Sequence, residues 1–418
     1  MKNKLAIFGG KKFINRKFKE FKTHDIKEQN AAIKVLKSGI LSDFIANDSE
    51  FFYGGKYVKL LEEKFKKYFK SNYAISVNSW TSGLVCAVGS LNIKPGDEII
   101  VSPWTMSATA TAILAWGGIP IFSEIDNDTY CLDPNYIVEK ISKKTRAIVV
   151  TDIFGQSANY KKINLIAKKY SLKVISDTAQ AIGSKQNNQY SGTLCDIGGF
   201  SLNRHKHIHC GEGGIILIDN KKLAENMFKI RNHGEVINKD SKFKNILGFN
   251  FRMNEIEAAI SIEQLKKLNK ILRKKIENAK LLSAGLSNLK GLKTPKISKN
   301  NTHVYYSFPL QIDENLIKIK KTKILKTLKE EGLPINGQYV NLLDYKIYRD
   351  KKIKRNFPWN LSKRKKFYSK KENVYKQIKY LNDKKYMDIS FCKYDFEKKD
   401  IDLIIGCFHK VWKNLNII

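Results

Sequence analysis

The 418-residue sequence is poor in acidic residues and has no long apolar run. It contains 40 Asp and Glu residues against 76 Lys and Arg residues, which gives a formal net charge of +36. Its six cysteines are widely spaced and form no Cys-x-x-Cys pair, so we expect reduced thiols and not a disulfide framework. No stretch of about 18 apolar residues occurs, and the apolar run near the N-terminus is too short for a signal-peptide core. We therefore expect a cytoplasmic protein without a transmembrane helix.

The composition is that of a chain with a sizeable core. Hydrophobic residues make up 42% and aromatic residues 11% of the sequence, which argues against a disordered or collagen-like chain. The positive charge makes nucleic acid or another anionic surface the first partner to consider. However, the basic residues are spread along the chain, as expected if lysine serves as a general solubilising residue. No compact basic and aromatic motif occurs, so we expect no nucleic-acid partner and no membrane partner.

Two kinds of segment alternate along the first two thirds of the chain. Helical spacing of apolar residues predicts helices, and short β-branched runs between them predict strands that are buried on both faces. The predicted helices are 28–38, 57–70, 81–90 and 161–170, and the predicted strands are Tyr73–Val77, Glu98–Val101, Ile119–Phe122, Ala147–Thr151, Leu172–Ser176, Gly198–Leu202 and Gly214–Ile218. This alternation predicts an α/β fold with a mostly parallel sheet.

The pattern changes after a long predicted helix at Arg252–Leu272. Beyond it the chain is richer in lysine and mixes short strands with helices, including a closing amphipathic helix around residues 401–412. We therefore expect a large domain over residues 1–270 and a smaller α+β domain over 271–418. Residues 1–50 are expected to pack in part on the smaller domain.

Residues that follow the predicted strands are candidates for a binding site, because ligands of parallel sheets bind at the carboxyl ends of the strands. Asp177 and Gln180 follow one strand, and Lys206 follows another, in a loop next to a glycine-rich turn. A buried carboxylate needs a cationic partner, which could be a structural lysine or arginine or a protonated cofactor ring. Burial lowers the pKa of a lysine and makes it a nucleophile that can form a Schiff base.

The histidines around Lys206 allow a second interpretation. His205, His207 and His209 alternate, so on a strand they would share one face and could bind a metal ion. No acidic or cysteine ligand stands nearby at a diagnostic spacing. We therefore predict no metal at this site.

Two further loops complete the candidate site. The segment that holds Thr81 and Ser82 opens a helix, where hydroxyl and free backbone N–H groups form an anion site or an ordinary helix cap. A second turn contains Trp104 and Met106, which could cover a flat ring or belong to the core. A lysine, a carboxylate, a glutamine and an anion cradle at successive strand ends are together what pyridoxal phosphate requires.

Several stretches of the chain resemble the DegT/DnrJ/StrS family of sugar aminotransferases, which have the aspartate-aminotransferase fold (fold type I). The resemblance is clear over residues 54–265 and looser beyond. The matching stretches are GGKYVKLLEEKF (54–65), VNSWTSGL (77–84), KPGDEIIVSPWTMSATATAI (94–113), DIFGQSA (152–158), VISDTAQAIGS (174–184), FSLNRHKHIHCGEGG (200–214), RNHGE (231–235) and GFNFRMNEIEAAI (248–260). The combination of D-x-A-Q with S-x-x-x-x-K-x-x-x-x-G-E-G-G is the most specific part.

The resemblance implies a role for each matching residue. Lys206 would be the Schiff-base lysine, Asp177 would pair with the pyridine nitrogen, and Gln180 would contact the ring hydroxyl. The phosphate would be held by Thr81, Ser82, Ser201 and, from the neighbouring subunit, Asn250. The last contact implies a homodimer with shared active sites.

The chain also departs from the family pattern. Trp80 stands in the phosphate loop where the family often has a glycine, and Met106 stands where a ring-stacking aromatic residue is common. Some family members are dehydratases in which histidine replaces the lysine, so Lys206 favours transamination.

The expected activity is transfer of an amino group from L-glutamate or glutamine to a keto-sugar, with pyridoxamine phosphate as the intermediate form of the cofactor. Such an activity would serve amino-sugar and polysaccharide biosynthesis. The acceptor could be nucleotide-linked. It could also be a free keto-sugar, octulosonate or keto-inositol, which the segment 332–348 favours. A dehydratase and a non-catalytic cofactor-binding regulator remain as alternatives.

Overall fold

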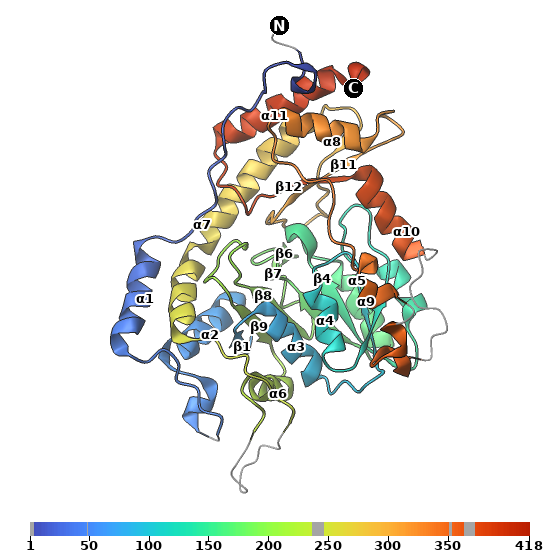
Figure 1. Cartoon of the computed structure of the whole chain (residues 1–418). Coiled ribbons are helices and arrows are strands. Elements are labelled where there is room, and N and C mark those ends of the chain that lie inside the picture. Colours follow the sequence, from blue (N-terminus) through green and yellow to red (C-terminus); the bar gives the residue numbers. More distant parts are fainter. Residues whose placement is uncertain (1–3, 48, 236–245, 351–352, 363–372) are drawn as a thin grey trace.

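A seven-stranded sheet forms the centre of the larger part of the molecule (Figure 1). The computed structural model describes residues 4–47, 49–235, 246–350, 353–362 and 373–418. The strand order is β1-β9-β8-β5-β4-β2-β3. These strands are β1 (Tyr73–Val77), β2 (Glu98–Val101), β3 (Ile119–Phe122), β4 (Thr145–Thr151), β5 (Lys173–Asp177), β8 (Ile197–Ser201) and β9 (Gly214–Ile218). A small hairpin, β6 (Lys185–Gln186) with β7 (Gln189–Tyr190), lies apart from the sheet.

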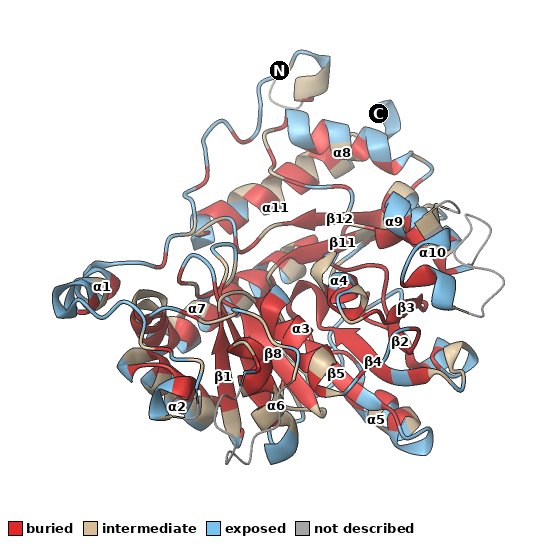
Figure 2. Ribbon diagram, turned by 60° about the horizontal axis from the view of Figure 1, so that its bottom comes forward, coloured by how far each residue is buried: buried red, intermediate tan, exposed pale blue. Residues whose placement is uncertain are grey.

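The sheet is mostly parallel, as the strand and helix alternation predicts. Only β9 runs against its two neighbours, β1 and β8. The other recorded pairings, from β8 through β5, β4 and β2 to β3, are parallel. The predicted strands are confirmed with shifts of at most two residues at their ends. Their near-continuous apolar sequences fit, because helices cover both faces and the strands are almost wholly buried (Figure 2).

Helices pack against the two sheets, and α3 is buried on almost all sides. The helices are α1 (Ile26–Ser38), α2 (Lys56–Phe69), α3 (Trp80–Ser90), α4 (Ala108–Leu114), α5 (Tyr160–Lys169), α6 (Lys221–Arg231), α7 (Glu255–Leu286), α8 (Lys321–Glu330), α9 (Lys346–Arg349), α10 (Asn373–Tyr380) and α11 (Lys398–Lys413). Local sequence explains several of their starts. Asp25 and Glu28 form a capping box at α1, and the Ser79 hydroxyl accepts a hydrogen bond from the backbone N–H of Ser82 at the start of α3.

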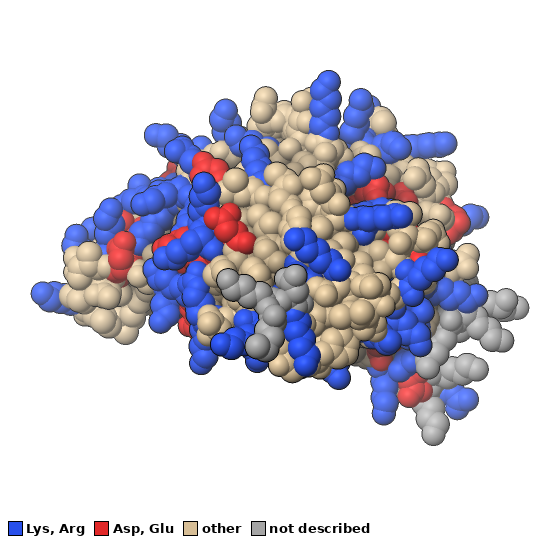
Figure 3. Space-filling view, turned by 90° about the horizontal axis from the view of Figure 1, so that it is seen from above, with Lys and Arg blue, Asp and Glu red and all other residues tan. Residues whose placement is uncertain are grey.

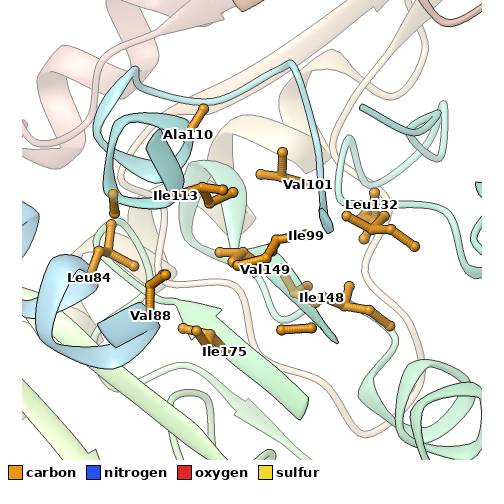
Figure 4. Close-up of a cluster of buried hydrophobic side chains, with 14 of the residues drawn as sticks. Leu84, Val88, Ile99, Val101, Ala110, Ile113, Leu132, Ile148, Val149 and Ile175 are labelled. Atoms are coloured by element: carbon orange, nitrogen blue, oxygen red, sulfur yellow. The ribbon is translucent and has the colours of Figure 1, made fainter. Parts of the chain in front are cut away.

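The main core lies between the sheet and helices α3 and α4. Figure 4 shows side chains of these helices facing β2, β4 and β5. The labelled contributors are Leu84 and Val88 from α3, Ala110 and Ile113 from α4, Ile99 and Val101 from β2, Ile148 and Val149 from β4, Ile175 from β5, and Leu132. This packing holds the start of α3 against the strand ends that carry the candidate site.

A second core lies around the three-stranded antiparallel sheet β10-β11-β12. Its strands are β10 (Leu292–Lys293), β11 (Phe308–Ile312) and β12 (Tyr386–Ile389), and it packs with α8 and α11. The N-terminal residues Leu5, Ile14 and Phe18 also belong to this second core.

The long helix α7 passes through residue 270 without a break and joins the two parts (Figure 1). Leu265, Leu268 and Leu272 pack in a core with α2 and the large sheet, whereas Ala279 and Leu282 pack in the second core. We propose that the division lies within α7, just beyond the expected position of residue 270. The buried hydrophobic side chains described between residues 342 and 381 belong to the main core, so we assign this segment to the surface of the large unit.

The positive charge is distributed over the surface. Lys and Arg side chains project from many places around the face in Figure 3, interspersed with fewer Asp and Glu side chains. Across the described ranges, we find no helix whose length and hydropathy would suit a bilayer span.

Candidate active site

The candidate site lies where the carboxyl ends of β1, β8 and β5 meet the amino end of β9. Gly214 of β9 pairs with both Val77 of β1 and Ser201 of β8. In the next pair of strands, Gly199 stands opposite Asp177. The predicted phosphate-binding residues and the predicted carboxylate therefore lie along one edge of the sheet.

Both carboxylate oxygens of Asp177 accept hydrogen bonds from buried side chains. The indole N–H of Trp80 donates to Oδ1 at 2.7 Å, and the hydroxyl of Thr109 donates to Oδ2 at 2.6 Å. The Thr109 hydroxyl is itself hydrogen-bonded to the Thr105 hydroxyl at 3.0 Å, and the Thr151 hydroxyl donates to Thr105 at 3.2 Å. The backbone N–H of Ala179 also donates to Oδ1, at 3.3 Å. These contacts fix the carboxylate in its plane and leave a lone pair of Oδ2 for a further donor.

Lys206 lies in a turn that follows β8. Its Nζ atom lies 4.7 Å from the centre of the Tyr306 ring. Burial lowers the pKa of this amine, while the negative charge of Asp177 acts in the opposite direction. A lysine with a lowered pKa is more often neutral at physiological pH, and the neutral amine is the nucleophile that attacks an aldehyde.

This lowered pKa predicts how the reactivity of Lys206 depends on pH. Covalent capture of pyridoxal phosphate should rise with pH through a midpoint below 10.5, the ordinary lysine pKa. Replacing Asp177 with Asn should shift the midpoint further down, because the carboxylate charge favours the protonated amine. Stopped-flow absorbance of the apoprotein across a pH series would measure this midpoint. A midpoint at or above the ordinary value would contradict the burial argument.

The expected phosphate end is the start of α3. Ser82 is buried, and its hydroxyl donates to the Asn78 side chain at 2.6 Å and contacts the Ser79 hydroxyl at 2.9 Å. Thr81 is exposed at the first turn of the helix, and Ser201 is buried at the end of β8. The hydroxyls and free backbone N–H groups at this helix end can receive an anion. The cap of the helix is Ser79, whose hydroxyl accepts from the backbone N–H of Ser82, and neither Thr81 nor Ser82. A helix cap and an anion site are compatible at this position.

Gln180 and Met106 are the two side chains expected to contact the cofactor ring, and they differ in their surroundings. The Gln180 side chain accepts from the backbone N–H of Phe154 at 2.8 Å and donates to the Tyr339 hydroxyl at 2.9 Å. Met106 is 56% exposed, and its sulfur accepts from the backbone N–H of Ala108 at 3.2 Å. The Gln180 amide is therefore held in place, whereas the Met106 side chain can still reorient.

Asn250 lies at the surface beside the start of α3. Its carbonyl accepts a hydrogen bond from the Asn78 side chain at 3.4 Å, and its amide oxygen accepts from Arg252 at 2.9 Å. The side chain is exposed, so it remains available to another subunit.

The three histidines around Lys206 do not form a cluster. The alternating strand considered for them is not formed, because residues 204–208 make a turn. His207 is buried and hydrogen-bonded to the Val304 carbonyl at 2.8 Å, His209 packs edge-on against His24, and His205 is exposed. Within the described ranges, no group of three or more His, Cys, Asp or Glu residues is placed to hold a metal ion. Burial lowers the pKa of His207 to about 3, as expected for a neutral packing residue.

Sequence reasoning missed three contacts at this site. It placed Trp80 in the phosphate loop, but the indole points inward to Asp177. It assigned no role to Thr109 or to Tyr306, which come from α4 and from the loop before β11. A tryptophan beside a strand end carries a polar donor that usually finds a partner when buried, and this was the one signal available.

The comparisons with known proteins point to one family. Residues 43–365 match the model of the DegT/DnrJ/EryC1/StrS aminotransferase family. One relative is the dTDP-3-amino-3,6-dideoxy-alpha-D-galactopyranose transaminase of Aneurinibacillus thermoaerophilus, 35% identical over 68% of this chain and 75% of that protein. Another is the 3-oxo-glucose-6-phosphate:glutamate aminotransferase of Bacillus subtilis, 33% identical over 62% of this chain and 59% of that protein.

A solved structure supports the fold. An aminotransferase from Psychrobacter cryohalolentis superimposes with a TM-score of 0.82 at 22% identity, covering 96% of this chain and 100% of that one. The expected fold, the fold type I of pyridoxal-phosphate-dependent transferases, is thereby confirmed.

Proposed function

Because the chain belongs to the DegT/DnrJ/EryC1/StrS aminotransferase family, we propose that it moves an amino group from L-glutamate, or glutamine, to a keto-sugar by means of pyridoxal phosphate. The chain is an aminotransferase; the donor, the acceptor and the cofactor are the proposal. The observation that carries it is the pairing of Lys206, whose pKa burial lowers, with the oriented carboxylate of Asp177 at one edge of the sheet.

The donor set fits this cofactor. Lys206 is in position to hold an aldehyde covalently, and Asp177 can accept a hydrogen bond from a protonated ring nitrogen. The start of α3, with Thr81 and Ser82, and the neighbouring Ser201 can bind a phosphate. When bound, pyridoxal phosphate supplies the electron sink for a substrate carbanion.

The protein residues then perform the proton transfers. With the cofactor bound, Lys206 would hold it, and the free Lys206 amine would take the proton from the Cα atom of the amino donor and return it in a later step. A positioned acid and base of this kind contributes roughly 10²–10⁴-fold to the rate. Gln180 would contact the ring hydroxyl, and Met106 would cover one ring face through its polarizable sulfur.

A basic cavity beside the site supports an anionic acceptor. The cavity, of about 520 Å³, is lined by Tyr306, which contacts Lys206, and by Lys22, Arg204, His205 and Lys393. Both relatives named above are described with phosphate-bearing sugars. We therefore favour a nucleotide-linked or phosphorylated keto-sugar over a free, uncharged one, and a role in amino-sugar or polysaccharide biosynthesis.

We further propose a homodimer in which Asn250 of each subunit reaches the partner's phosphate site. Helix α1 and the loop after it expose several apolar side chains, including Ile33, Leu36 and Ile40. Buried against a second copy, these side chains would be removed from water. Light scattering of the purified protein tests this point, and a monomeric mass would contradict it.

The absorption spectrum of the protein loaded with pyridoxal phosphate tests the proposed function. We expect a yellow band that bleaches when L-glutamate is added without acceptor and returns when a suitable keto-sugar is added. Nucleotide-linked, phosphorylated and free keto-sugars can then be compared as acceptors. A band that persists with every amino donor would overturn transamination and favour the dehydratase or the non-catalytic regulator. Protein that forms no band would overturn the assignment of Lys206.

A further inference from the structure

Trp80 connects two parts of the candidate site that lie on different strands. It is the first residue of α3, the helix whose start forms the expected phosphate site, and its side chain is 4% exposed. From there the indole extends across the sheet edge to Asp177, where its N–H donates a hydrogen bond of 2.7 Å. The side chain therefore spans from the end of β1 to the end of β5.

Glycines make room for this path. A Cβ atom on Gly199, which stands opposite Asp177 in the sheet, would lie 2.3 Å from the Trp80 ring, and one on Gly83 would lie 2.7 Å from it. A Cβ atom on Gly214 would lie 2.8 Å from the Trp80 backbone. Real carbon atoms do not approach so closely. A side chain at Gly83 or Gly199 would collide with the indole, at Gly199 also with the Ile215 carbonyl at 2.2 Å, and one at Gly214 would collide with the backbone at the start of α3. Gly83, Gly199 and Gly214 thus form a glycine slot, which the indole fills.

The backbone N–H of Ala179 donates a longer hydrogen bond, of 3.3 Å, to the same oxygen as Trp80. The two side-chain donors to Asp177 differ in how strictly they orient it. The Thr109 hydroxyl can rotate about its C–O bond and can act as donor or acceptor. The indole N–H of Trp80 is a donor only, and its direction is set by a ring that the glycine slot confines. Of the two side-chain donors, Trp80 therefore fixes the plane in which the remaining lone pair of Asp177 Oδ2 is presented.

We propose that Trp80 is a positioning residue that orients the Asp177 carboxylate toward the ring nitrogen of pyridoxal phosphate and couples this orientation to the phosphate-binding start of α3. This inference rests on the proposed function. It assigns to Trp80 a role in ring-nitrogen recognition and not in the phosphate loop. The effect of Trp80 passes through Asp177, so it should depend on the ring nitrogen itself.

The experiment compares two ligands of the apoprotein by fluorescence titration. One is pyridoxal phosphate, and the other is its 1-deaza analogue, in which carbon replaces the ring nitrogen. The natural protein should bind pyridoxal phosphate more tightly than the analogue. In Trp80→Phe we expect this preference to fall by about tenfold, as for a lost hydrogen bond to a charged group, with little change in affinity for the analogue.

Trp116→Phe is the matched control. The Trp116 indole also donates to α3, to the Val85 carbonyl at 2.8 Å, but it does not touch Asp177. Its removal should leave the preference for the ring nitrogen unchanged. If Trp80→Phe does not fold, 3-benzothienylalanine at position 80, introduced at an amber codon, keeps the shape of the indole and replaces its N–H with sulfur.

The outcomes separate this inference from the proposed function. Equal weakening of both ligands in the Trp80 variant, or no change in either, would overturn the positioning role and leave the function intact. If the natural protein itself does not distinguish the two ligands, the pairing of Asp177 with the ring nitrogen fails, and the proposed function with it.

Discussion

Turnover is expected to disappear when Lys206 is replaced by alanine, while pyridoxal phosphate still binds without a covalent bond. The variant loses both the amine that holds the cofactor and the group that moves the proton, and the second loss alone should cost roughly 10²–10⁴-fold in rate. Borohydride treatment of the natural protein should attach the cofactor permanently to Lys206, and peptide mapping would locate it. The variant should incorporate no label.

Lys275 provides a control for this experiment. It is also a lysine whose pKa burial lowers, and its amine donates to the Phe391 carbonyl at 2.5 Å. If low pKa alone determined where the cofactor attaches, label would appear there. We expect Lys275→Met to lose stability but to keep the label on Lys206 and the turnover. Label on Lys275, or turnover that survives in Lys206→Ala, would refute the assignment.

The second large effect is expected for Asp177→Asn. A carboxylate about 4 Å from a protonated ring nitrogen is worth about 4 kcal/mol at an effective dielectric constant near 20, so kcat should fall about a thousandfold. The fold should survive, because the Asn amide oxygen can still accept from Trp80 and the Thr109 hydroxyl can rotate to accept from the amide N–H. Single-turnover kinetics with L-glutamate would show the loss in the proton-transfer step.

Asp152→Asn is the matched control for Asp177. Asp152 is the neighbouring buried carboxyl, and it accepts hydrogen bonds from the Ala158 backbone and the Thr178 hydroxyl, both at 2.8 Å. Burial raises the pKa of Asp152 to about 7, so a neutral side chain is a mild change at this position. We expect the kcat of the Asp152→Asn variant to stay within a few-fold of the kcat of the natural protein. An unchanged rate in Asp177→Asn would assign the ring-nitrogen role to another group.

The strands and helices of the large unit could be predicted from local pattern. The apolar runs at Tyr73–Val77 and Glu98–Val101 are strands with those bounds, since each is bounded by turn residues and is apolar enough for burial on both faces. The long helix was predicted to end near residue 272 but continues to Leu286. Its apolar residues keep their helical spacing there, but they pack against the second core and no longer against the large sheet. Local periodicity carries no information about which core a helix turn meets.

The family motifs located the chemistry but not all of its surroundings. Asp177 ends one strand, Gln180 follows it, and Lys206 follows another strand, so the general rule for parallel sheets was enough to place them at one edge. For the three neighbouring histidines, the alternating spacing left open a shared strand face as an alternative, although we predicted no metal, and that strand is not formed. In the turn that forms instead, the His207 ring is hydrogen-bonded to the Val304 carbonyl, almost a hundred positions away, and local spacing does not reveal such a contact.

The sequence by itself determined the fold class, the order of the elements and the positions of the lysine and carboxylate that we propose as reactive, because these follow from periodicity and from short motifs with contiguous residues. Only the tertiary structure decided what surrounds them. Trp80, Thr109 and Tyr306 come from three separate elements, and their contacts arise from the register of the sheet and from the space left by Gly199. A hydrogen bond between residues 97 positions apart leaves no mark on the local pattern of either partner, and so only the folded chain reveals it.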